Sequence, residues 1–310
     1  MQTTLTTAEI SSTGSSTHTI AALLGFLPER QAFQLLLQDI IVDAPKSLEA
    51  IAALWEKARK QSSYPPKHAV PSVIDVKALP SQWQTYEQEL KSRSAYLRWY
   101  TGFADYKMWC VPTSQLITPQ WFADLDYIEM LSKRSPEPED WEGALNFAFG
   151  EDTVWQTPLI TALNDNAVAV TFRSPAQNLL FTPPTLCPPQ VRPISALEYE
   201  VAVRVGVKPN YLQVGRIQGK YIIINGVHRA TALWKAGWKH IPCLVREARQ
   251  LNEIFTPGTL GIIPEVQSLS RPPYIHDLFT EEIALRFNQR NTDQVLRVLL
   301  QSDTLPISRD

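Results

Sequence analysis

A chain of 310 residues with 44% hydrophobic and 19% charged side chains has the composition of a folded globular protein, long enough for one large or two ordinary domains. Its net charge of −2 disfavours a dedicated nucleic-acid-binding protein, which usually carries a strong basic excess. Three widely spaced cysteines without metal-site or redox-motif spacing indicate a reducing cytosol and no zinc site. No apolar run approaches the ~18 residues of a membrane span, so we expect a cytoplasmic protein with no membrane partner.

Residues 1–101 predict a tail and a helical module. Residues 1–19 are rich in Ser and Thr and lack the basic start and apolar centre of a signal peptide, so they predict a disordered tail. Residues 20–101 predict a helical module. Its three expected helices start at residues that favour helix starts and run from Pro28 to about Ile41, from the N-cap Ser47 through Trp55, and from Ser81 to about Tyr100.

Strand patterns become frequent after residue 106. The expected elements are a strand over 106–111, a strand and loop over 116–128, a short helix over 141–149, and a hairpin of 167–172 with 179–181. The acids Asp124, Asp126 and Glu129 are closely spaced but lack a Mg²⁺ ligand pattern, so a solvated helix face is the preferred interpretation. A further helix is expected over 195–205, with Ser195 and Glu198 at capping-box spacing.

Residues 221–245 carry the clearest pattern, a strand, a tight turn, a helix and a second strand. Ile222, Ile223 and Ile224 form a β-branched run of the kind found in buried strands, and Asn225-Gly226 breaks it. The helix that follows has apolar side chains on one face, and its end is marked by a C-cap glycine, Gly237. Residues 251–310 predict a helical extension, with its main helix over 277–301.

The turn at Gly226 is the best candidate for chemistry. His228 and Arg229 fall on the first turn of the predicted helix, where free N–H groups and the helix dipole favour an anion. A glycine for close approach and a guanidinium fork would complete a phosphate or carboxylate site. The alternative is an ordinary turn with polar surface residues.

The same stretch resembles the nucleotide-binding domains of the ParB/sulfiredoxin superfamily. The matching residues are Gly226, His228, Arg229, Ala232, Gly237, Ile241 and Pro242. This resemblance covers roughly residues 190–250, and it implies an α+β fold: a ParB/sulfiredoxin-like small mixed sheet with flanking helices over 106–250, added to the N-terminal helical module.

Departures from the family pattern narrow the branch. Val227 stands where sulfiredoxins carry their reactive cysteine, so a covalent sulfur intermediate is not expected. Val227, His228 and Thr231 replace the Glu and two Arg residues of partition ParB proteins, which disfavours a chromosome-partition role. The Gly-x-His-Arg form is most similar to the branch that includes free amino-acid kinases.

The resemblance implies a protein that binds ATP or another nucleotide, with Mg²⁺, and that carries out phosphoryl transfer or NTP hydrolysis. The implied nucleotide-binding residues are Asn225, Gly226, Val227, His228, Arg229 and Thr231. The implied catalytic residues are Glu198, Glu200 and His228, although Glu198 is also explained as a capping residue.

Two other functions stay open. One is a non-catalytic regulatory protein that keeps the fold and contacts protein partners through the N-terminal module or the C-terminal helix. The other is nucleic-acid binding or cleavage through a local group of basic residues, for which a solvated face is the simpler explanation. That group is Arg204, Lys208, Arg216, Lys220, Arg229, Lys235, Lys239, His240, Arg246 and Arg249.

Overall fold

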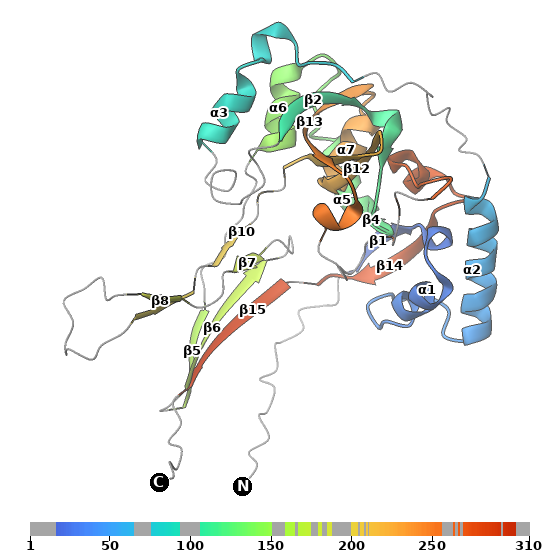
Figure 1. Ribbon diagram of the computed structural model, residues 1–310. Coiled ribbons are helices and arrows are strands. Elements are labelled where there is room, and N and C mark those ends of the chain that lie inside the picture. The colour runs from blue at the N-terminus through green and yellow to red at the C-terminus, as the bar shows by residue number, and fades with distance from the viewer. Residues whose placement is uncertain are drawn as a thin grey trace. The chain divides into compact units, whose positions relative to one another are not determined.

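A computed structural model gives the protein a mixed α+β architecture in two compact units (Figure 1). Unit 1 comprises Met1–Gly150 and Tyr211–Asn291, and unit 2 comprises Glu151–Asn210 and Thr292–Asp310. The structure describes residues 17–64, 76–93, 106–150, 159–164, 167–174, 179–181, 185–187, 200–203, 205–207, 209, 211–255, 263, 266, 269–292 and 294–301.

A five-stranded mixed sheet forms the centre of unit 1. Its strand order is β2 (Lys107–Pro112), β13 (His240–Ala248), β11 (Gln213–Ile217), β12 (Lys220–Asn225) and β3 (Leu116–Ile117). Strands β11 and β12 form an antiparallel hairpin, whereas β11 and β13 run parallel. Helix α7 (Val227–Lys235) joins β12 to β13, so the predicted strand, turn, helix and strand are confirmed. Gly237, at φ +91°, follows the helix end as expected.

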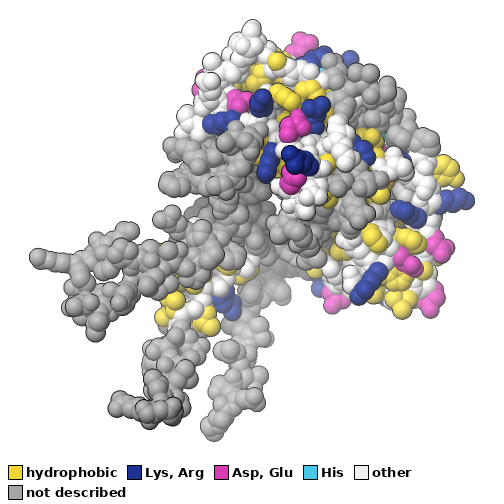
Figure 2. Space-filling view, viewed as in Figure 1, with side chains coloured by type: hydrophobic (Ala, Val, Ile, Leu, Met, Phe, Trp, Pro, Cys, Tyr) yellow, Lys and Arg dark blue, Asp and Glu magenta, His cyan; other side chains and the backbone are white. Residues whose placement is uncertain are grey.

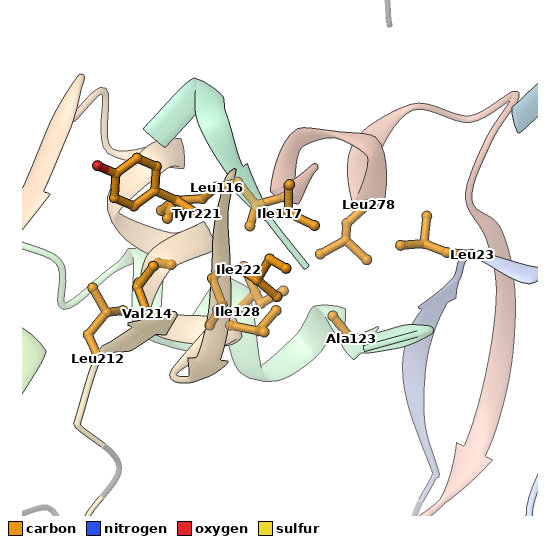
Figure 3. Packing of buried hydrophobic residues seen from close by; sticks show 14 of the residues in the cluster. Leu23, Leu116, Ile117, Ala123, Ile128, Leu212, Val214, Tyr221, Ile222 and Leu278 are labelled. Atoms are coloured by element: carbon orange, nitrogen blue, oxygen red, sulfur yellow. The ribbon is translucent and has the colours of Figure 1, made fainter. Parts of the chain in front are cut away.

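Two further helices of unit 1 accompany this sheet. They are α5 (Leu125–Ser132) and α6 (Trp141–Phe149), and α6 confirms the predicted helix over 141–149. Figure 3 shows Ile222 of β12 beside Ile128 of α5, within the buried apolar cluster. Both side chains are fully buried, as the β-branched run predicts.

A second sheet of unit 1 brings together strands from opposite ends of the chain. Its order is β14 (Leu285–Arg290), β1 (Thr17–Ala22) and β4 (Phe122–Asp124). The expected C-terminal helix over 277–301 is therefore wrong, because 285–290 and 294–301 are strands. Along β14, Phe287 and Gln289 are buried while their neighbours Arg286, Asn288 and Arg290 are exposed, which is the period of a half-buried strand.

The N-terminal helices are confirmed in number but not in every boundary. Helix α1 (Glu29–Leu36) follows Pro28 and ends before Ile41. Residues 17–22 belong to β1, so the disordered tail expected over 1–19 is wrong for 17–19, and the helical module expected from residue 20 is wrong for 20–22. Helix α2 (Leu48–Ser62) has the predicted cap, since Ser47 Oγ accepts a hydrogen bond from Ala50 N at 3.1 Å. Helix α3 (Tyr86–Arg93) begins later than expected, and 94–100 lie outside the described residues.

Short 3₁₀ segments connect these elements. They are η1 (Leu24–Phe26), η2 (Ser81–Trp83), η4 (Thr113–Gln115), η5 (Leu251–Glu253) and η7 (Ile275–Phe279). Among all the residues that the structure describes, no helix is long and apolar enough to cross a lipid bilayer.

The described residues of unit 2 form three small antiparallel sheets. One has the order β15 (Gln294–Gln301), β6 (Ala167–Ser174) and β5 (Leu159–Asn164). The others pair β7 (Leu179–Phe181) with β10 (Val205–Val207) and β8 (Thr185–Cys187) with β9 (Glu200–Ala202).

Two expectations for unit 2 are corrected by these pairings. The predicted strands at 167–172 and 179–181 exist, but they pair with other strands instead of forming a hairpin. The expected helix over 195–205 is wrong for its described part, because 200–202 and 205–207 are strands. The wrong pairing arises because β6 pairs with β15, far along the chain, and the wrong helix arises because strand partners stabilise an extended backbone that local propensity does not specify.

A buried ion pair closes the segment that contains η7. Arg271 Nη2 and Nη1 donate to Asp277 Oδ1 and Oδ2 at 2.8 and 3.2 Å, and the two side chains are 10% and 1% exposed. Asp277 Oδ2 also accepts from Tyr274 N at 2.8 Å, and Phe279 of η7 packs on Trp234 of α7 at 5.7 Å between ring centroids. The pair therefore fixes the segment that packs beside α7.

Removing this cation should be costly. Arg271→Met is expected to lower the free energy of unfolding by about 3–5 kcal/mol, because the Asp277 carboxylate would remain buried and uncompensated. Arg216→Met is the matched control, since its pair with Glu247 is largely exposed and its loss should cost less than about 1 kcal/mol. Urea unfolding measures both, and equal losses for the two variants would contradict the assignment.

Candidate functional site

The candidate site is the turn from β12 into α7. Gly226 occupies the N-cap position with φ +89° and ψ 27°, a left-handed conformation that favours glycine. A Cβ at this position would lie 3.1 Å from Leu212 Cδ1 and 3.2 Å from Leu212 Cα. The backbone of Leu212, the residue before β11, therefore also requires the glycine. Because Gly226 has no side chain, the N-cap supplies no side-chain oxygen to the first N–H groups of α7.

Arg229 is buried inside unit 1, with 4% of its surface exposed. Its Nη1 donates to the carbonyl oxygens of Ala148 and Gly150, both at 3.4 Å. These carbonyls belong to the last turn of α6 and its C-cap, where a cation is favoured by the helix dipole. Ala148 O also accepts from Leu212 N at 3.0 Å, so Arg229 joins the end of α6 and the approach to β11 to the start of α7.

Whereas Arg229 bonds to the end of α6, His228 contacts the start of α5. Its Nε2 lies 3.0 Å from Asp124 N and accepts that hydrogen bond, which assigns the proton of the neutral ring to Nδ1. The Tyr127 ring stands edge-on at 5.3 Å. Burial lowers the pKa of His228 from 6.5 to about 4, against a smaller raising effect of the Asp124 carboxylate. His228 is therefore neutral at pH 7, and the lone pair of its Nε2 accepts the hydrogen bond from Asp124 N.

Asp124 is the residue of this junction whose role the sequence did not show. Its Oδ1 accepts from Tyr127 N at 2.8 Å and caps α5, and its Oδ2 lies 3.6 Å from His18 Nε2. The neighbouring acids also have protein partners: Asp126 accepts from Thr19 N at 2.9 Å, and Glu129 pairs with Lys235 at 2.6 Å. Among the described residues, no three His, Cys, Asp or Glu side chains are grouped to hold a metal ion.

The other predicted nucleotide-binding residues surround the same turn. Thr231 is fully buried and its Oγ1 donates to Val227 O at 2.7 Å, within its own helix. Val227 is buried, while Asn225 is half-buried at the end of β12, opposite Gln213. The structure thus brings the six predicted residues together, with the Thr231 hydroxyl turned to the helix backbone.

The predicted acidic catalytic residues are Glu198 and Glu200. Glu198 lies outside the described residues. Glu200 begins β9 in unit 2, where its backbone pairs with Cys187, whereas His228 lies in unit 1.

Five of the ten residues of the expected basic group have protein partners within unit 1. Arg216 pairs with Glu247 at 2.8 Å, Lys220 donates to Leu269 O at 3.3 Å, and Arg246 donates to Glu253 O at 3.2 Å. Together with buried Arg229 and paired Lys235, these contacts disperse the positive charge among carboxylates and carbonyls. They favour the solvated-face interpretation over a nucleic-acid surface.

Unit 1 contains two of the three cysteines of the chain. Cys110 and Cys243 are both buried free thiols. Burial raises the pKa of Cys110 to about 12 and raises that of Cys243 well above its ordinary value. Neither forms a thiolate at neutral pH, so both act as core residues.

Comparison of the chain with protein-family models, with curated proteins and with solved structures gives no match.

The neutral state of His228 gives the protein a defined pH dependence. Because the folded pKa is about 4 and the ordinary value is 6.5, the unfolded chain binds a proton here that the folded chain does not. Stability from this group is complete above pH 6.5 and declines as pH falls toward 4, by at most about 1.4 kcal/mol per pH unit. His228→Gln keeps an acceptor that does not titrate. The free energy of unfolding, measured with urea from pH 7 to pH 4, should therefore fall less steeply with pH in this variant than in the wild type. An unchanged slope would show that His228 does not titrate differently on unfolding.

Proposed function

We propose that this protein binds a nucleotide through its phosphate groups at the first turn of α7, without transferring a phosphoryl group. The observation that carries the proposal is the helix start that follows Gly226, where the N-cap offers no side-chain acceptor to the helix N–H groups. Such a helix start combines free donors with a partial positive charge and is a recurrent site for phosphate.

The side chains of the turn act in this proposal as positioning residues. Arg229 and His228 each hold a different neighbour, the end of α6 and the start of α5, on the two sides of the turn. A turn fixed in this way presents its backbone donors without a cost of reordering on binding. The bound ligand would be ATP or another nucleotide, as the family resemblance implies, and Mg²⁺ would arrive with its phosphates.

The proposal includes no phosphoryl transfer because His228 is unsuited to act as a general base. A general base needs a free lone pair and a pKa near the working pH. His228 Nε2 already accepts from Asp124 N, and the pKa of the ring is about 4. Arg229 is likewise committed to Ala148 and Gly150, instead of standing free to neutralise a transferred phosphoryl group.

A regulatory or interaction protein that keeps the fold is the second candidate. This candidate is favoured by the hydrogen bonds of the turn, since the side chains of His228, Arg229 and Thr231 all bond to protein groups. In this case the turn at Gly226 serves folding, and binding partners use other surfaces. Nucleic-acid binding or cleavage is the weakest proposal, because five side chains of the basic group are engaged with protein groups.

A single charge placed beside the turn tests nucleotide binding. Asn225→Asp is isosteric and should weaken ATP or CTP binding by about tenfold or more in calorimetry, because a carboxylate near the helix start repels phosphate. Asn252→Asp is the matched control: it adds the same charge to unit 1 at an exposed position of η5 and should leave affinity unchanged.

Three outcomes of this experiment would argue against the proposal. No heat with ATP, ADP or CTP, with or without Mg²⁺, would leave the interaction protein as the better candidate. Equal losses for Asn225→Asp and Asn252→Asp would place the anion elsewhere. Unchanged ATP affinity in a stably folded Arg229→Gln variant would show that Arg229 does not position the turn for binding.

A further inference from the structure

Strand β15 forms one edge of the unit 2 sheet. All eight of its residues pair with β6, from Gln294 opposite Ser174 to Gln301 opposite Ala167. Across the strands that the structure describes, β6 is its one neighbour, because the sheet order is β15-β6-β5. The other side of β15 therefore presents a row of backbone donors and acceptors, which we call the β15 edge.

Three apolar side chains of this edge are exposed. Val295, Leu299 and Leu300 are 50%, 53% and 56% exposed, and Arg297 is the one charged residue of the strand. Figure 2 shows hydrophobic side chains at the surface over the position of β6 and β15. A long apolar edge strand with a single charge readily pairs with another strand.

The edge strand β2 of unit 1 shows how this chain protects an edge. Glu87 Oε2 of α3 accepts from Met108 N at 2.7 Å, and Lys91 Nζ donates to Tyr106 O at 2.8 Å. The backbone of Lys77 exchanges hydrogen bonds with Cys110 at 3.1 and 2.8 Å. Charged side chains and a short bridge thus cover β2. No contact of this kind is found on β15 within the described part of the chain.

We propose that the β15 edge pairs with the β15 edge of a second copy of this chain. Antiparallel pairing about a two-fold axis perpendicular to the sheet joins the two three-stranded sheets into one continuous sheet, and such isologous contacts are the commonest in homodimers. This inference concerns unit 2 and does not depend on the nucleotide proposed for unit 1.

The pattern of side chains selects the register. Residues that face each other across the axis must lie on the same face, so the axis passes through a residue and not between two. With the axis at Val298, Leu296 faces Leu300 of the second copy and Val298 faces its own counterpart. These residues share a face with Val168, Val170 and Phe172 of β6, so an apolar face continues across the interface.

The neighbouring register is less favourable. An axis at Arg297 would set the two guanidinium groups directly opposite each other, and like charges in this position destabilise a sheet. With the axis at Val298, each Arg297 instead faces Leu299 of the second copy. Leu299 is therefore the position at which a new charge reports on the pairing.

Two substitutions of opposite charge at Leu299 test the proposal in the full-length chain. Leu299→Arg places a cation opposite Arg297 twice per dimer and should raise the dissociation constant about tenfold. Leu299→Glu places an anion opposite the same Arg297 and should leave the dimer as stable as wild type or more so. Sedimentation equilibrium over a range of concentrations measures both, and thermal unfolding checks that each variant is folded.

A Leu299→Arg, Arg297→Glu double variant provides the rescue. It restores opposite charges across the axis and should recover the wild-type dissociation constant. The proposal is overturned if the wild-type chain is monomeric up to about 100 µM, at which a Kd in the micromolar range would give dimer. It is also overturned if both single variants weaken association alike, if neither does, or if oligomers grow without limit, as head-to-tail pairing of β15 with β5 would produce.

Discussion

The burial of Arg229 is the constraint on which the rest of unit 1 depends. A guanidinium inside a protein must be matched by acceptors, and Arg229 finds them in the carbonyls of Ala148 and Gly150 at the end of α6. Since Ala148 O also accepts from Leu212 N, one cluster of carbonyls fixes the last turn of α6, the entry to β11 and the start of α7. Gly226 then turns the chain into α7 where Leu212 leaves no room for a side chain.

This arrangement changes what the turn can do. In the sequence, Gly226, His228 and Arg229 have the order of a phosphate-gripping motif. In the structure, the two side chains bind protein backbone on opposite sides of the helix start, so they stabilise the turn, and the binding that we propose would use backbone N–H groups. Rigid backbone donors suit binding, whereas phosphoryl transfer would need a base and a mobile cation.

The parts that could be predicted from the sequence are those with local causes. The β-branched run of β12, the glycine after it and the apolar face of α7 specify their own structure, and Ser47 caps α2 as expected. The sequence over 285–301 predicts a helix instead of strands β14 and β15, because the partners that stabilise these strands lie far along the chain. Strand β14 pairs with β1, from the other end of the chain, and β15 pairs with β6. The partners of His228 and Arg229 are a backbone amide and two carbonyls, which no residue type announces.

The most direct test of this account is the response of backbone amides to a nucleotide. In ¹⁵N-resolved NMR spectra, ATP is expected to shift the amide signals of Val227, His228 and Arg229 most strongly, because their N–H groups form the first turn of α7. The side-chain signals of Arg229 should stay unchanged, since its guanidinium remains on α6. Shifts confined to other parts of the chain, or a dominant change of the Arg229 side chain, would contradict it.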